Sequence, residues 1–328
     1  TSFQRDGAAG QAAWQQTAAA FATAVDAGRL DLPLPGGGAT WERWDTLADL
    51  AGEDLSLARL GEGHADALAI LAELGGPRPL TGSRWGVWAA NPPGPNVTAT
   101  RDGSSWLLRG TKQYCSGARV CTNALVTAAA EDGWRLFAVE AGVLEPRDGS
   151  WPATGMAGSD TLDVGFPWVR AEPVGPPDGY TDRPGFSHGG AGVAACWYGG
   201  ARAVGQTLLA AAAKRDVGPH ALAHLGAVDL GLRTARAALR QAAGEIDDDP
   251  DDRQGAGPLR ALRVRTLTEA VAADVLARTG RALGAGPLGH DRAHSRAVAD
   301  LTVYLRQHHA EQDLARLGEL VADGRAEW

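Results

Sequence analysis

The spacing of apolar residues changes twice along the chain, and these changes limit the folds that the chain can adopt. Between residues 80 and 180, apolar residues occur in short alternating runs separated by turn residues, a pattern typical of strands. Asp102-Gly103 and Asp132-Gly133 lie between such runs and indicate tight hairpins. The runs predict strands at 84–90, 96–100, 105–109, 124–130, 134–140 and 162–169. Their spacing of roughly ten residues favours a small antiparallel barrel or sandwich.

The residues on both sides of this region follow the three-to-four spacing of amphipathic helices. The spacing predicts a helix at 11–25, two helices within 53–74, and four later helices at 192–215, 222–246, 259–282 and 293–318. The acidic run 247–252 lacks the alternating ligands of a calcium loop, so we expect a solvated connection there. The predicted fold is therefore a multi-domain α+β protein: an N-terminal helical domain (1–78), a central antiparallel β-barrel or sandwich (79–182) and a C-terminal four-helix bundle (183–328).

Charge and composition disfavour several classes of protein. A formal charge of −8 and a sequence pI near 5.5 are the opposite of what a nucleic-acid-binding protein usually carries. No apolar stretch is long enough for a membrane span, and the N-terminus lacks the apolar core of a secretory signal. The three cysteines include no CxxC pair, so neither a metal site nor a disulfide framework is expected. These features predict a soluble, cytoplasmic protein.

Four stretches of the sequence together resemble a known family. The first reads LRGTKQYCSGA at 108–118 and is followed by TNALVTA at 122–128. The second reads GMAGSDT at 155–161 and continues with VGFPWV at 164–169. The third is the small-residue run 193–203, and the fourth is 281–318. In this order and spacing the stretches are similar to those of the acyl-CoA dehydrogenase family of flavoproteins. The resemblance implies the same order of helical domain, β-barrel and four-helix bundle, with FAD as the cofactor.

The resemblance implies flavin-contacting residues on two strands. In the family, an aromatic side chain packs beside the flavin and a hydroxyl group binds near its N5 atom, and Tyr114 and Ser116 occupy these two places. On the preceding strand Ala90 replaces a flavin-binding threonine, and Trp88 is expected to compensate by stacking. Two alternatives stay open: Tyr114 is a half-buried residue of an ordinary strand, and Trp88 belongs to the barrel core.

The family also binds the FAD phosphates, partly through an adjacent subunit. Arg215 lies in the place of one phosphate-binding motif, and its guanidinium group matches phosphate oxygens. Arg281, Gly284 and Gly286 lie in the place of a second motif, where glycine lets the backbone approach a phosphate closely. A site shared between subunits implies a homodimer or a homotetramer.

The place of the family's catalytic glutamate is occupied by His308, eight residues after Asp300. An imidazole with an unperturbed pKa of about 6.5 suits proton transfer near neutral pH. The resemblance therefore makes His308 the candidate base. The alternative is that His308 and His309 are a solvent-facing pair, or one core and one exposed residue, on an amphipathic helix.

The first functional expectation is FAD-dependent α,β-dehydrogenation of an acyl thioester of CoA or an acyl carrier protein, with electrons passing to an accepting flavoprotein. The alternative is a flavin-dependent monooxygenase of the same superfamily, which takes reduced flavin from a separate flavin reductase. Cys115-Ser116-Gly117 resembles the variant of the first stretch that such monooxygenases carry. A third alternative is a non-catalytic flavin- or acyl-binding homologue.

Overall fold

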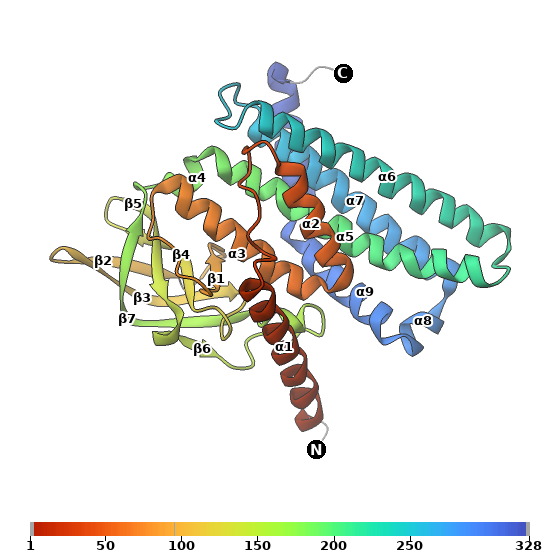
Figure 1. The fold of residues 1–328 in the computed structure, drawn as a ribbon, viewed down its shortest axis with the longest axis horizontal. Helices are drawn as coiled ribbons and strands as arrows, with labels where there is room; N and C mark the ends of the chain where they lie inside the picture. Colours follow the sequence, from red (N-terminus) through yellow and green to blue (C-terminus); the bar gives the residue numbers. More distant parts are fainter. Residues whose placement is uncertain (1–2, 95, 326–328) are drawn as a thin grey trace. The chain divides into compact units, whose positions relative to one another are not determined.

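The predicted order of helices, strands and helices is confirmed in the computed structural model (Figure 1), which describes residues 3–94 and 96–325, with side chains for 14–94 and 96–324. The helices α1 (Phe3–Asp26), α2 (Thr40–Glu53) and α3 (Leu55–Leu74) precede the strands. The chain divides into two compact units, each described separately below. The barrel unit contains Thr1–Leu32 and Arg59–Phe186, and the helical unit contains Pro33–Ala58 and Ser187–Trp328. The division into three domains at 78 and 182 stays a prediction.

The strands form a closed barrel. They are β1 (Trp85–Trp88), β2 (Val97–Asp102), β3 (Ser105–Cys115), β4 (Asn123–Ala130), β5 (Gly133–Glu140), β6 (Glu145–Arg147) and β7 (Leu162–Val174). The pairing runs β4, β2, β3, β7, β5 and returns to β4, with β1 added to β4 and β6 added to β7. All six predicted strands and both Asp-Gly hairpins are confirmed. The expected antiparallel pairing holds for β2 with β3, β4 with β5 and β7 with its three partners, whereas β1 and β2 pair with β4 in parallel. Residue alternation alone does not reveal such a partner.

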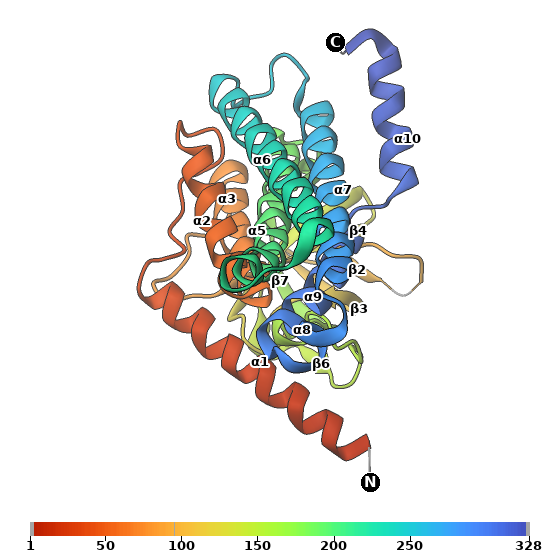
Figure 2. The ribbon, with the colours of Figure 1, turned by 90° about the vertical axis from the view of Figure 1, so that its right-hand side faces the viewer.

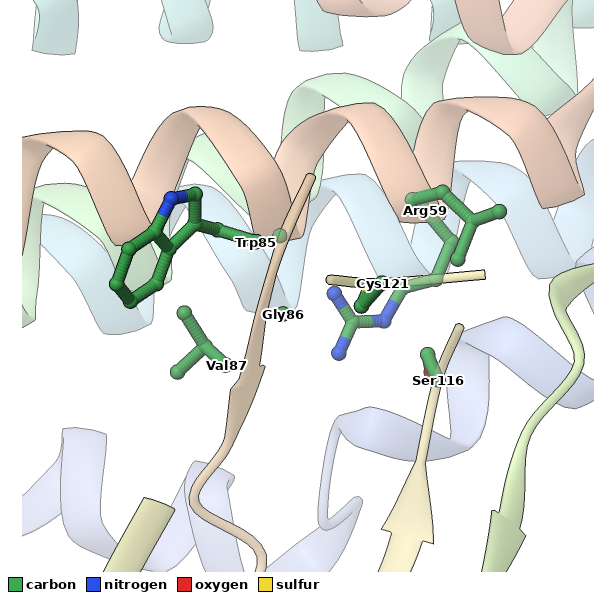
Figure 3. Close-up of a pocket in the computed structure, with 8 residues that line it drawn as sticks. Arg59, Trp85, Gly86, Val87, Ser116 and Cys121 are labelled. Carbon is green, nitrogen blue, oxygen red and sulfur yellow. The ribbon is translucent and has the colours of Figure 1, made fainter. Parts of the chain in front are cut away.

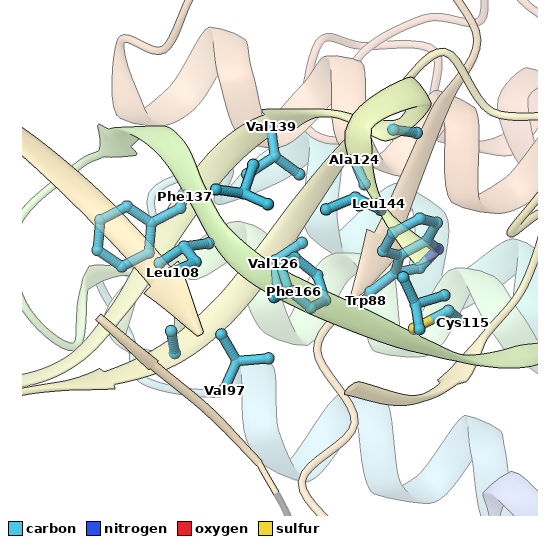
Figure 4. Close-up of a cluster of buried hydrophobic side chains, with 14 of the residues drawn as sticks. Trp88, Val97, Leu108, Cys115, Ala124, Val126, Phe137, Val139, Leu144 and Phe166 are labelled. Carbon is cyan, nitrogen blue, oxygen red and sulfur yellow. The ribbon is translucent and has the colours of Figure 1, made fainter. Parts of the chain in front are cut away.

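Alternation along the strands separates two apolar cores in the barrel unit. Val126 and Phe137 point into the barrel, where they pack with Leu108 and Phe166 (Figure 4). Their sequence neighbours Leu125 and Leu136 face the other way and pack with Ile70, Leu71 and Trp85 under α3. Because each buried side chain of this size stabilises the fold by roughly 1.5–3 kcal/mol, α3 and the barrel support each other.

The helical unit contains α2, most of α5 (Pro184–Lys214), α6 (Gly218–Asp248), α7 (Gly257–Leu283), α8 (Ala285–His290), α9 (Arg292–Tyr304) and α10 (Glu311–Leu320). The part of α5 that belongs to this unit begins at Ser187. Figure 2 shows α5, α6 and α7 side by side, which confirms three predicted long helices. The predicted single helix at 293–318 is wrong: a 3-10 turn (Leu305–Gln307) and extended His308 separate α9 from α10. Ala310, with a φ of 48°, begins α10 in a new direction. A four-helix bundle is not confirmed.

The helix α2 was not predicted, because the interactions that begin it come from a distant part of the chain. The Asp247 carboxylate accepts hydrogen bonds from the backbone N–H groups of Gly38 (3.0 Å) and Thr40 (3.0 Å) and from the Thr40 hydroxyl (2.6 Å). Asp249, also in the acidic run, is buried and accepts from the backbone N–H groups of Arg253 and Gln254. The acidic run is therefore only partly the solvated connection that we expected.

Replacing Asp247 with alanine should lower the free energy of unfolding by about 2 kcal/mol, because Gly38, just before α2, and Thr40, its first residue, lose the acceptor of three hydrogen bonds. Urea denaturation followed by circular dichroism measures this loss. Asp248→Ala is the matched control: Asp248 is the adjacent, exposed residue, and its replacement should change stability by less than about 0.5 kcal/mol. Equal effects of the two variants would contradict the role given to Asp247.

Candidate functional site

Two of the resembling stretches meet at one edge of the barrel. The backbone N–H of Gly117, just after β3, donates to the carbonyl oxygen of Ser159 at 2.8 Å. The N–H of Ala118 donates to the carbonyl oxygen of Asp160 at 3.1 Å. The first stretch is thus joined by backbone hydrogen bonds to the segment that precedes β7, and the side chains of both lie close together.

A chain of hydroxyl groups connects these side chains. The Ser116 Oγ lies 3.0 Å from the Thr161 Oγ1, which lies 2.8 Å from the Ser159 Oγ. The Ser159 hydroxyl in turn donates to the carbonyl oxygen of Met156 at 2.7 Å. All three hydroxyl-bearing residues are buried. We did not predict roles for Ser159 and Thr161, although three polar residues directly before an apolar strand were a visible signal.

A buried ion pair holds this segment in place. The Asp160 carboxylate accepts from the backbone N–H of Arg119 at 2.7 Å, from its Nε at 2.8 Å and from its Nη2. The Arg119 guanidinium also lies over the Trp14 ring of α1, 4.1 Å from the ring centroid. Asp160 has a φ of 48°, a left-handed conformation that these contacts stabilise.

A small hollow lies between α3, β1 and the end of β3 (Figure 3), with an accessible volume of about 10 Å³. It is lined by Arg59, Leu60, Gly63, Trp85, Gly86, Val87, Ser116 and Cys121. Typical small-molecule sites measure roughly 300–1,000 Å³, whereas this hollow has room for about one water molecule, so it does not hold a ring system. Burial raises the pKa of Cys121 to about 12, so this thiol stays protonated at neutral pH.

The predicted flavin residues on β1 and β3 have different surroundings. Ser116 lines the hollow. Tyr114 is 53% exposed, has a φ of 59° at an irregularity in the pairing of β3 with β7, and contacts Trp151 edge-to-face. Trp88 is 1% exposed in the barrel core, where its Nε1–H donates to the carbonyl oxygen of Ser116. The structure therefore places Trp88 in the core, as the alternative had it, and Ala90 is exposed after β1.

The predicted phosphate-binding residues lie in the helical unit. Arg215 is exposed in the turn between α5 and α6, and Arg281 is exposed at the end of α7. Gly284 has a φ of 65° at the start of α8, so glycine is favoured there, whereas a Cβ at Gly286 would meet no atom within 4 Å. Their role toward a phosphate stays a prediction.

His308 is buried, and both of its ring nitrogens have partners. The backbone N–H of Ala310 donates to the His308 Nδ1 at 3.1 Å, and the His308 Nε2 lies 3.0 Å from the Thr266 Oγ1. Nδ1 is therefore the acceptor, and the neutral ring carries its proton on Nε2. Burial lowers the pKa of His308, although Asp313 opposes this change. The role as a base stays a prediction, and it requires the bond from Ala310 to open.

The structure separates His308 from the phosphate candidates within the helical unit. Thr266, the partner of His308, and Arg281 both belong to α7. Fifteen residues of α-helix span about 22 Å, so one small group does not contact both positions. The residues predicted for the phosphate site and His308 thus lie at separate places in the helical unit.

The fold is one that flavin-bound enzymes share. No family model and no curated protein sequence matches this chain. TdsC from Paenibacillus sp. A11-2, in a complex with FMN and indole, matches with a TM-score of 0.74, 18% identity, and coverage of 97% of this chain and 98% of that chain.

Two further solved structures have the same fold. KijD3, in a complex with FMN and dTDP-3-amino-2,3,6-trideoxy-4-keto-3-methyl-D-glucose, matches with a TM-score of 0.74 and 19% identity over 97% of this chain and 95% of that chain. The methanesulfinate monooxygenase MsuC from Pseudomonas fluorescens matches with a TM-score of 0.68 and 19% identity, over 95% of this chain and 96% of that chain. At these identities the comparisons establish the fold. Among the helices of the described residues, none has the length and apolarity that a membrane crossing needs.

Proposed function

We propose that the chain is a flavin-dependent monooxygenase that binds FMN at the barrel edge beside Tyr114 and Ser116 and receives it in reduced form from a flavin reductase. The single observation that carries this proposal is the place of Ser116: it directly follows β3 at the barrel edge, in the position where the resembling family has a hydroxyl near flavin N5. The similarity to FMN complexes and to monooxygenases supports this choice over an FAD-dependent dehydrogenase.

The barrel edge offers the kinds of group that contact a flavin. Ser116 has a hydroxyl group, which either donates or accepts a hydrogen bond, and Tyr114 has an exposed aromatic ring. The nearby Arg59 guanidinium is paired with Glu62 at 2.6 Å. A bound reduced flavin supplies the electrons with which O₂ oxygenates a substrate.

Each residue has a stated task in this proposal. Ser116 orients the ring through its hydroxyl, while the Arg119–Asp160 pair keeps the supporting segment in place. Arg215, Arg281, Gly284 and Gly286 stay candidates for the flavin phosphate, in which case a homo-oligomer completes the site. Acyl thioesters stay an alternative substrate class.

The test is anaerobic titration of the purified protein with reduced FMN, followed by O₂ uptake with a flavin reductase, NADH and indole, dibenzothiophene or methanesulfinate as substrates. We expect FMN binding and substrate-dependent oxygenation. Ser116→Ala should weaken FMN binding about five- to tenfold, the effect of one hydrogen bond. Ser105→Ala, at the opposite end of β3, is the control and should leave the affinity unchanged. Bleaching of bound FAD by an acyl-CoA without oxygen would instead support the dehydrogenase.

A further inference from the structure

The His308 side chain bridges the break between α9 and α10. Its Nδ1 accepts the backbone N–H of Ala310 at 3.1 Å, and its Nε2–H donates to the Thr266 Oγ1 of α7 at 3.0 Å. His308 is 4% exposed, and its ring contacts the Trp197 ring of α5 edge-to-face. One imidazole thus joins the start of α10 to α7 and α5.

The backbone that this ring holds is strained, and α10 has few other attachments. Ala310 has a φ of 48° and a ψ of −119°, a conformation that favours glycine. Of the ten residues of α10, all of which the structure describes, only Leu320 is buried, and Leu314 is 51% exposed. A helix with so few buried apolar contacts opens locally at a low free energy. The hydrogen bond to the His308 Nδ1 therefore contributes a large share of what keeps α10 in place.

The bond from Ala310 requires an Nδ1 without a proton. A backbone N–H only donates, so a proton on Nδ1 would set two donors against each other. The other nitrogen of the ring does not compensate, because Nε2–H already donates to Thr266 in the neutral form. Protonation of His308 while α10 is docked therefore removes one hydrogen bond without strengthening the bond to Thr266.

The charges around the ring act in both directions. Four charged or titratable groups face it: Arg265 and Glu269 of α7, the adjacent His309, and Asp313 of α10. The Glu269 carboxylate is already paired with Arg306 at 2.6 Å. Asp313 lies 3.6 Å from the His308 Nε2 and accepts the His309 backbone N–H at 3.0 Å. Burial outweighs these two carboxylates and lowers the pKa of His308, so the docked ring takes up a proton less readily than a released one.

We propose that His308 is a pH-sensitive latch, which holds α10 on α7 while its ring is neutral and releases α10 when the ring takes up a proton. This inference does not depend on flavin binding. A released imidazole titrates near its ordinary pKa of about 6.5, so the docked state loses stability as the pH falls below that value. At pH 5.5 about ten released rings are protonated for each neutral one, so release increases by up to about tenfold relative to pH 7.5.

The test is hydrogen–deuterium exchange of the full chain at pH 7.5 and 5.5, corrected for the intrinsic exchange rate at each pH. In the wild type we expect the α10 amides to exchange about five- to tenfold faster at pH 5.5. The α6 amides, followed in the same samples, should not change. His308→Asn keeps an acceptor oxygen in the place of Nδ1 but does not titrate, so its α10 amides should stay protected at both pH values.

His309→Asn is the matched control, because the adjacent His309 side chain is 66% exposed and makes no bond to Ala310. This variant should keep the wild-type response, and its loss there would overturn the assignment to His308. Unchanged exchange of α10 in the wild type overturns the inference even if His308→Asn fails to fold. Slower exchange in acid would also contradict it, because Asp313 would then hold the charged ring in place. An equal increase in α6 would mean that acid loosens the whole helical unit, which likewise overturns the latch. None of these readouts involves FMN, so the latch and the proposed function can fail separately.

Discussion

Replacing Asp160 with alanine should lower the free energy of unfolding by about 3 kcal/mol. The Asp160 side chain is 1% exposed and accepts hydrogen bonds from the backbone and the guanidinium group of Arg119. Removing one partner of a buried ion pair leaves the other charge uncompensated and costs roughly 3–5 kcal/mol. We take the lower end of that range because the Arg119 side chain keeps 27% of its surface exposed.

The chain offers a matched control for this prediction. Asp148 also pairs with Arg119, at 2.9 Å, but its side chain is 83% exposed. Exposed pairs contribute roughly 0–1 kcal/mol, so Asp148→Ala should have little effect on the same urea-denaturation curve. If the two variants lose equal stability, burial is not what makes the Asp160 pair important. Asp160→Ala should also weaken FMN binding, because Ser159 and Thr161 flank the replaced residue.

Replacing Lys112 with methionine should change how stability depends on pH. Lys112 is buried in the barrel, where its ammonium group donates to the Thr127 carbonyl and hydroxyl oxygens, both at 2.9 Å, and to the Asn96 side chain at 3.1 Å. Burial nevertheless lowers the pKa of Lys112 from 10.5 to about 8, because these neutral oxygens do not replace the lost hydration of the charge.

The direction of the pH effect follows from proton binding. Between pH 8 and 10.5 the unfolded chain retains a proton on Lys112 that the folded chain has released. The free energy of unfolding of the wild type therefore rises with pH across this window, by up to about 3 kcal/mol relative to Lys112→Met. Below pH 8 Lys112 is protonated in both the folded and the unfolded chain, so it no longer changes the free energy of unfolding with pH.

Urea denaturation at pH 7, 8, 9 and 10 measures the difference between the wild type and Lys112→Met. Groups that titrate in both proteins cancel in that difference. Lys214→Met is the control, because Lys214 is the only other lysine and is exposed at the end of α5. Its pH dependence should follow that of the wild type. A difference that stays flat from pH 7 to 10 would mean that the hydrogen bonds keep the pKa of Lys112 near its ordinary value.

The candidate site was predictable only in part. Ser116 and Tyr114 were found because they lie in a continuous stretch whose spacing resembles a known family. Arg59 was missed because it lies among the apolar residues of α3, and its place at the hollow depends on β1 and β3. Thr161 and Ser159 were missed as partners of Ser116 because 45 residues separate Ser116 from Thr161.

The sequence by itself determined the elements whose signal is local. Strand alternation, Asp-Gly turns and helical spacing act between near neighbours, so the order of helices, barrel strands and helices was predictable. Only the tertiary structure decided the parallel pairing of β1 with β4, the start of α2 on Asp247, the break at His308 and the hydroxyl chain behind Ser116. Each of these depends on hydrogen bonds between groups that folding brings together from distant positions. Such bonds produce no regular spacing of residues along the sequence, so the sequence pattern does not reveal them.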